Sequence, residues 1–172
     1  TSRLWLRTAD NSMFAALMGK LMPYTIIFTI LGIVGNILLY WYMGYPMNSH
    51  IGWMFLTTFL YVMAYQAVGT LIIGITPVLR DGVTLAAFYG LLGFTYAGFT
   101  FPIEQLPYVA QIFSELFPIR HYFKVYVNQA LNGLSIGYSV DYLIALLAFT
   151  VLPLLVYIRL KKAAIYQDYP TK

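Results

Sequence analysis

Two scarcities narrow what this chain of 172 residues can be. It contains no cysteine, which excludes disulfides, thiolate metal sites and cysteine nucleophiles. Charged residues make up only 9% of the chain, while 60% of its residues are hydrophobic. A soluble domain normally carries about 25% charged residues on its surface. The composition therefore excludes a soluble enzyme and indicates a protein that lies in a lipid bilayer.

Several long segments carry no charge at all. Residues 21–79, 82–103 and 142–158 contain no Lys, Arg, Asp or Glu. One helix crosses the hydrocarbon core with about 20 residues, so the first segment fits two helices joined at the Gly, Pro and Asn of 44–50. We expect an all-α, polytopic membrane protein in which Pro153 kinks the last span. The four predicted transmembrane helices are 22–43, 51–76, 82–101 and 138–159.

Residues 104–132 form a segment of a different kind. Each charge at the centre of a span costs about 2.5–3.5 kcal/mol on insertion scales, and this segment holds four formal charges. Pro107 and Pro118 divide it into two pieces. We predict a re-entrant, extracytoplasmic pair of amphipathic helices that packs against the spans, with Glu104 paired to Arg120.

The positive charges predict the orientation. Eight of the ten Lys and Arg residues flank one side of the predicted spans, and only Arg120 and Lys124 lie on the other. Lys and Arg are enriched in cytoplasmic loops. Both ends of the segment are therefore expected in the cytoplasm, including a tail at 160–172.

Residues 1–18 precede the first predicted span. A short helix at Met13–Met18 is expected to lead into the membrane. Before it, apolar side chains alternate with arginine, which suits either a helix lying in the membrane interface or one that docks on a cytoplasmic partner. The residues that would make the docking contact are Leu4, Trp5, Leu6 and Arg7.

The sequence carries no pattern of catalytic or cofactor chemistry. His50 and His121 lie far apart without a second metal ligand, and Gly19-Lys20 lacks the rest of a phosphate-binding loop. The thinly spread basic residues do not predict a nucleic-acid partner. No ionisable residue falls at a predicted helix centre, which argues against an ion-coupled carrier. The polar residues within the spans are assigned either to helix packing or to contact with a cargo: Asn36, Thr57, Thr58 and Gln66.

Three short motifs resemble the signature of ABC-2 type permeases. Gly98 to Pro107 reads Gly-x-x-Phe-Pro-x-x-x-x-Pro, and Pro118-Ile-Arg-His-Tyr follows about a dozen residues later. Upstream, Gly19-Lys20-Leu-Met-Pro-Tyr is similar to the start of the third helix in that family. The resemblance is to the multidrug-type subgroup, and it implies that the four predicted spans are the third to sixth of six helices, within a longer protein.

The resemblance also implies a function. It suggests the permease subunit of an ATP-driven exporter in a bacterial inner membrane, moving an amphipathic or hydrophobic substrate outward. A separate ABC ATPase would bind and hydrolyse ATP with Mg²⁺ and would receive residues 4–7 as a coupling helix, so this chain itself is expected to be neither an enzyme nor a cofactor protein. Further implied partners are a second permease, membrane lipid and a periplasmic adaptor. The outer gate would include Phe101, Pro102, Ile103, Glu104, Leu106, Pro107, Pro118, Arg120 and Tyr122.

Two other functions remain open at this point. An ion-coupled secondary transporter would share the composition, and so would a membrane assembly protein that moves no cargo.

Overall fold

The computed structural model describes residues 13–76, 78–99 and 102–158. The described residues are helical and contain no strand, so the expected all-α class is confirmed. Leu4, Trp5, Leu6, Arg7 and Phe101, together with the tail at 160–172, lie outside the described residues.

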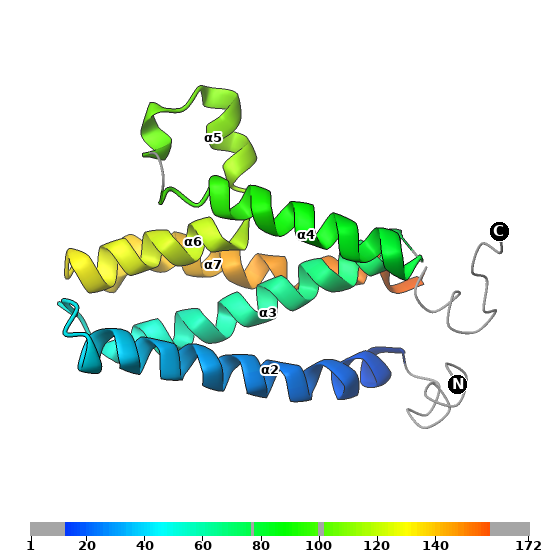
Figure 1. The fold of residues 1–172 in the computed structure, drawn as a ribbon, viewed down its shortest axis with the longest axis horizontal. Coiled ribbons are helices and arrows are strands. Elements are labelled where there is room, and N and C mark those ends of the chain that lie inside the picture. The colour runs from blue at the N-terminus through cyan, green and yellow to red at the C-terminus, as the bar shows by residue number, and fades with distance from the viewer. Residues whose placement is uncertain (1–12, 77, 100–101, 159–172) are drawn as a thin grey trace.

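Five longer helices carry the fold, and shorter helical pieces connect or extend them (Figure 1). The final helix resumes after a two-residue interruption and runs over 152–158. In chain order the elements are α2 (Met13–Ile37), η1 (Leu38–Tyr42), α3 (Ile51–Ile75), α4 (Leu79–Thr95), η2 (Ile103–Gln105), α5 (Tyr108–Ser114), α6 (Pro118–Tyr126), η3 (Val127–Leu131), η4 (Ile136–Ser139) and α7 (Val140–Phe149).

Three described helices are long and apolar enough to cross a membrane. They occupy Phe14–Tyr42, Ile51–Ile75 and Ile136–Ile158. Helix α4, expected at 82–101, begins earlier and ends at Thr95, which leaves it 17 residues long. That length is at the lower limit for a membrane-spanning helix.

Helix α2 runs further toward the N-terminus than the sequence predicted. Residues 13–18 were expected to form a separate short helix, but they are the first turns of α2, which continues through Pro23. A proline removes one backbone donor, and helices in a bilayer tolerate this loss better than soluble ones. The segment around Pro23 therefore belongs to the candidate membrane span Phe14–Tyr42 and not to a separate helix.

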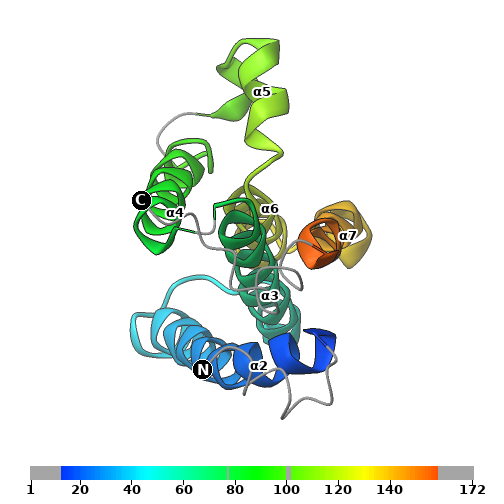
Figure 2. The same ribbon diagram turned by 90° about the vertical axis from the view of Figure 1, so that its right-hand side faces the viewer.

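Helix α3 lies at the centre of the bundle (Figure 2). It contacts α2, α4, α6 and α7, and small or hydroxyl-bearing residues make up most of its buried positions. A Cβ added at Gly74 would lie 2.6 Å from the Cβ of Val156 in the last helix, and one at Gly32 of α2 would meet the methyl group of Thr58. Small residues thus let α3 approach both neighbours closely.

The last helix is interrupted shortly before Pro153. Thr150 and Val151 form a turn, with the Thr150 amide donating to the Leu147 carbonyl at 3.0 Å and the Val151 amide to Ala148 at 3.1 Å. Pro153 follows directly and cannot donate a backbone hydrogen bond. The irregular turn therefore lies just before the proline that was expected to kink this helix.

Candidate functional site

Turn and bend residues 96–99 follow α4, where the Gly-x-x-Phe-Pro motif begins. Gly98 has a φ of +95°, a conformation that favours glycine, and a Cβ there would lie 3.2 Å from the Ile103 side chain. Ile103 is itself only 3% exposed. Pro102 precedes η2 and Pro107 precedes α5, and the Leu106 carbonyl accepts a hydrogen bond from the Gln111 amide at 2.9 Å. The side chain of Glu104 lies outside what the structure describes.

An ion pair ties α5 to α6. Arg120 Nη2 lies 2.7 Å from Glu115 Oε1, and Arg120 Nη1 donates to the Gln111 carbonyl at 3.0 Å. Arg120 is therefore paired with Glu115, and the pairing with Glu104 that the sequence suggested falls on a side chain outside the described part. Glu115 ends α5 and Arg120 lies in the first turn of α6, so the short connection between these helices brings the two charges together.

This charged turn lies level with the middle of the long helices (Figure 1). The ring of Tyr122 is 4.8 Å from that of Tyr61, near the centre of α3. The ring of His121 is 6.3 Å from Tyr142 and 5.9 Å from Phe149, which places it near the middle of the span Ile136–Ile158. These contacts place the turn beside the central part of α3 and of the last helix.

His121 is buried beside this ion pair. Its Nε2 lies 3.0 Å from the Glu115 carbonyl oxygen and 3.6 Å from Glu115 Oε2. A neutral ring that donates from Nε2 to the carbonyl accounts for these contacts and leaves Nδ1 without a partner.

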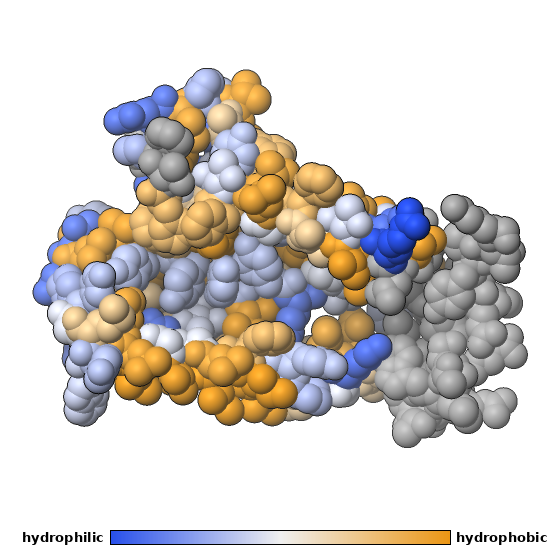
Figure 3. Space-filling model, in the orientation of Figure 1, coloured by the Kyte–Doolittle hydropathy of each residue, from blue (hydrophilic) through white to orange (hydrophobic). Residues whose placement is uncertain are grey.

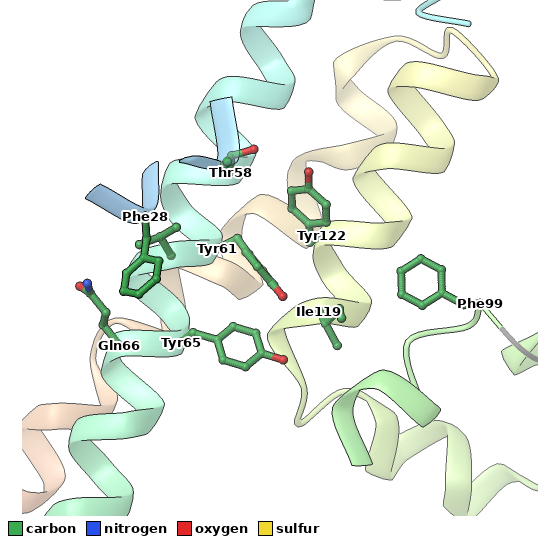
Figure 4. Close-up of a pocket in the computed structure, with 10 residues that line it drawn as sticks. Phe28, Thr58, Tyr61, Tyr65, Gln66, Phe99, Ile119 and Tyr122 are labelled. Carbon is green, nitrogen blue, oxygen red and sulfur yellow. The ribbon is translucent and has the colours of Figure 1, made fainter. Parts of the chain in front are cut away.

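Aromatic side chains surround a cavity next to the charged turn. The cavity has a volume of about 520 Å³ and lies between α2, α3, α6 and the turn at Phe99 (Figure 4). Tyr61 and Tyr65 extend from α3 toward Tyr122 and Ile119 of α6. Figure 3 shows a pale blue area between orange bands over α2 and α4. The sequence analysis named Tyr122 as a candidate site residue. It did not name Tyr61 and Tyr65, which lie one helical turn apart in α3.

The predicted polar residues of the spans are divided between two roles. Asn36 Nδ2 donates to Thr58 Oγ1 at 3.0 Å, joining α2 to α3, whereas the fully buried Thr57 hydroxyl bonds only the Trp53 carbonyl of its own helix. The Gln66 amide oxygen accepts from the Thr25 hydroxyl at 2.7 Å. Asn36 and Thr57 are thus packing residues, while Gln66 and Thr58 also line the aromatic cavity.

A polar clamp that the sequence analysis did not predict joins the connection between α2 and α3 to η3 and η4. Ser49 donates to the amide oxygen of Gln129 at 2.8 Å, and the Gln129 amide donates to Leu134 and to Ser139. Asn48 bonds the carbonyl of Leu131. No sequence periodicity predicts this clamp, because Asn48 and Ser49 lie about eighty positions before Leu131 and Gln129.

Comparison with known proteins decides the family. The family model described as ABC-2 type transporter matches residues 6–130, well over half of the chain. The chain belongs to the ABC-2 type transporter family. No curated protein and no solved structure matches it.

Family membership accounts for the main features of the fold. An ABC-2 membrane domain is the permease component of an ABC transporter, and such permeases normally work with an ABC ATPase. The apolar helices and the family together identify a multi-pass membrane protein. Within the described residues, no three His, Asp or Glu side chains come together as a possible metal site.

Proposed function

We propose that this chain is part of the permease of an ATP-driven exporter, which moves an amphipathic or hydrophobic substrate outward. The observation that carries the proposal is an ABC-2 membrane domain with an aromatic cavity beside a charged turn at mid-depth. A permease of this kind needs an uncharged path together with an element that can open or close it. The cavity and the helix pair beside it meet both requirements.

The proposal assigns four crossings and one re-entrant element. Helices α2, α3 and α7 span the membrane, and α4 enters from the cytoplasmic side as a fourth, short crossing. Helices α5 and α6 form a re-entrant hairpin whose tip is the Glu115–Arg120 ion pair. Backbone of this kind is tolerated at membrane depth where protein or water covers it, and α6 packs on α3 and α7.

The remaining parts of the proposal concern partners and location. Residues 4–7, outside the described part, dock as a coupling helix on a separate ATPase that binds ATP and Mg²⁺. Two permeases pair around the path in a bacterial inner membrane, with lipid around them and a periplasmic adaptor outside. Both ends of this segment lie in the cytoplasm, as the excess of Lys and Arg on that side supports. The multidrug-type subgroup is the assignment that the sequence motifs favour.

One observation favours a second candidate function. An ion-coupled carrier needs an ionisable group inside the membrane, and the proposed hairpin would put the adjacent Glu115 and His121 at that depth. The ion pair with Arg120 already neutralises the carboxylate, and the family works with an ATPase, so the exporter remains the better supported function.

Transport in inside-out vesicles distinguishes the two functions. The full-length protein with its ATPase should remove the amphipathic dye Hoechst 33342 from the vesicle membrane when ATP is added, and should not do so when only a pH gradient is imposed. Trp5→Asp should lower ATP-driven transport about tenfold, equivalent to roughly 1.4 kcal/mol of lost docking energy. Transport driven by the gradient alone would favour the carrier. Unchanged transport in Trp5→Asp would remove the coupling assignment.

A further inference from the structure

A second cavity, with a volume of about 450 Å³, lies between α2, α3 and the last helix. Its lining comes from 14–26 of α2, 59–67 of α3 and 150–157 of the last helix, and we call it the α2 groove. It shares only Gln66 with the aromatic cavity. Helices α2 and α7 both flank α3 (Figure 2). The candidate membrane span of α2 begins at Phe14, so the groove extends inward from one end of that span.

The α2 groove is continuous with the lipid-facing surface of the bundle. Three of its lining residues are more than half exposed, and they lie on two of its walls: Met22, Ile26 and Leu154. Exposed apolar side chains on the spans of a multi-pass membrane protein contact lipid chains. The acyl chains of the bilayer therefore lie at the opening of the groove.

The lining of the α2 groove offers little to a polar ligand. None of its fifteen lining residues is Lys, Arg, Asp, Glu or His. Thr25 and Gln66 bond each other at 2.7 Å, and the Thr150 hydroxyl donates to the Leu147 carbonyl at 2.6 Å. Tyr157, the remaining polar side chain, lies in the last described turn of its helix. A polar group inside this groove would lose its hydration without a partner, so the occupant is apolar.

The dimensions of the α2 groove fit one hydrocarbon chain. Along α2 it covers 14–26, which is about 18 Å of helix at a rise of about 1.5 Å per residue. One leaflet is about 15 Å thick, half of a hydrocarbon core of about 30 Å. Another helix, about 10 Å across, would fill about 1,400 Å³ over that length, roughly three times the volume of the groove. A helix is therefore too wide to lie inside it.

The methionines of the α2 groove suit a flexible occupant. Three of the seven methionines in the chain line it: Met18, Met22 and Met63. Their unbranched side chains adapt to irregular apolar shapes. The groove can therefore follow the bends of an acyl chain.

We propose that the α2 groove binds one acyl chain of a phospholipid, taken from the leaflet at the Phe14 end of the span. The headgroup then stays at the membrane surface near Tyr157, because tyrosine is enriched where membrane meets water. The acyl chain exchanges contacts with lipid for contacts with protein, so close packing holds it there. The proposal rests on the membrane-spanning helices and does not depend on the exporter.

Photolabelling with a phospholipid tests the proposal. The probe is a phosphatidylglycerol that carries a diazirine halfway along one acyl chain. The full-length protein in detergent is irradiated with increasing amounts of the probe, without ATP, and the labelled residues are mapped by mass spectrometry. Labelling of the groove residues should saturate, and an excess of unlabelled phosphatidylglycerol should lower it about tenfold. Labelling of Leu31, on the exposed face of α2, should instead rise in proportion to the probe.

Two variants obstruct the groove from different sides. Ala67→Phe adds a ring at a buried lining position, and Met22→Trp enlarges an exposed side chain at the edge. Each should lower the saturable labelling about tenfold. Ala86→Phe and Met43→Trp make the same changes at exposed positions outside the lining and should leave the labelling unchanged. Thermal unfolding shows which variants are folded, and Met22→Trp decides if Ala67→Phe is not.

The outcomes distinguish the phospholipid from other occupants. Groove labelling that does not saturate, or that persists in the folded variants, would overturn the proposal. Labelling of Leu31 without the groove would overturn it as well, because another part of the full-length protein would then cover the groove. A diazirine fatty acid is the second probe, and saturable labelling by it that excess phosphatidylglycerol does not reduce would identify a free fatty acid instead. Since no ATP is present, a failure of the exporter function would leave these results unchanged.

Discussion

Helices α2 and α3 are alike in sequence character and different in position. Both are long and apolar, and the mean hydropathy of their best windows is 1.9 and 1.6. Yet only 6% of the α2 window is buried inside the bundle, against 33% of the α3 window. The more hydrophobic helix is the more exposed one. Hydropathy therefore predicts that a helix enters the bilayer, whereas close packing decides which helix lies at the centre.

The difference between the two helices lies in their small and polar residues. Helix α3 buries Thr57, Thr58, Ala64, Ala67, Thr70 and Gly74, whereas α2 presents large apolar side chains such as Leu31 to its surroundings. Lipid chains are as apolar as leucine, so burying leucine between helices gains little. Small residues instead permit backbones to approach and van der Waals contacts to form.

The largest expected effect comes from filling the closest approach of α3. Gly74→Leu would place its side chain against Val156, 2.6 Å from the added Cβ, and should lower the free energy of unfolding by about 3 kcal/mol. Gly69→Leu is the matched control, because a Cβ at Gly69 meets nothing within 4 Å. Thermal unfolding in detergent measures both. Equal stability of the two variants would mean that α3 is not the packed centre.

A smaller effect is expected where α2 is tied to α3. Asn36→Leu and Thr58→Val each remove one partner of their 3.0 Å hydrogen bond. A double-mutant cycle should give a coupling of about 0.6 kcal/mol, the average for hydrogen bonds between membrane helices. Thermal unfolding in detergent is measured for the parent protein, the two single variants and the double variant. Strictly additive single variants would show that this bond does not hold the helices together.

The smallest effect is expected on the exposed face of α2. Leu31 is 59% exposed, so Leu31→Ala should change the free energy of unfolding by less than about 0.5 kcal/mol. Unfolding of the full-length protein in the same detergent tests this expectation. A loss near the 2–5 kcal/mol that is typical of a buried leucine would show that another helix covers this face.

The sequence predicted the elements better than their partners. The absence of charged residues predicted three long helices, and the presence of four charges distinguished segment 104–132 from them. A charge in hydrocarbon is costly wherever the helix packs. The pairing of Arg120 with Glu115 depends on how a short turn folds back, which no periodicity reports. The contacts of Gln129 with Ser49 and Ser139 likewise join residues distant in the chain. Pairings of this kind become visible only when the helices are assembled.

The candidate site was predicted in the same uneven way. Pro102 and Pro107 precede η2 and α5, Pro118 and Tyr122 lie in α6, and Gln66 lines the cavity. Tyr61 and Tyr65 escaped notice because aromatic residues are common throughout the spans and most of them pack or face lipid. Only the position of α6 beside α3 distinguishes these two tyrosines from the others.

The account rests on segment 79–132 carrying the chain from the cytoplasmic side to the outside through the hairpin. These 172 residues contain no cysteine, so single cysteines at His50, Arg80 and Asn132 report their sides of the membrane without interference from this part of the protein. With a membrane-impermeant maleimide on spheroplasts, His50→Cys and Asn132→Cys should react, and Arg80→Cys should react only after the membrane is opened. Reaction of Arg80→Cys in sealed spheroplasts, or protection of Asn132→Cys while His50→Cys reacts, would contradict the account.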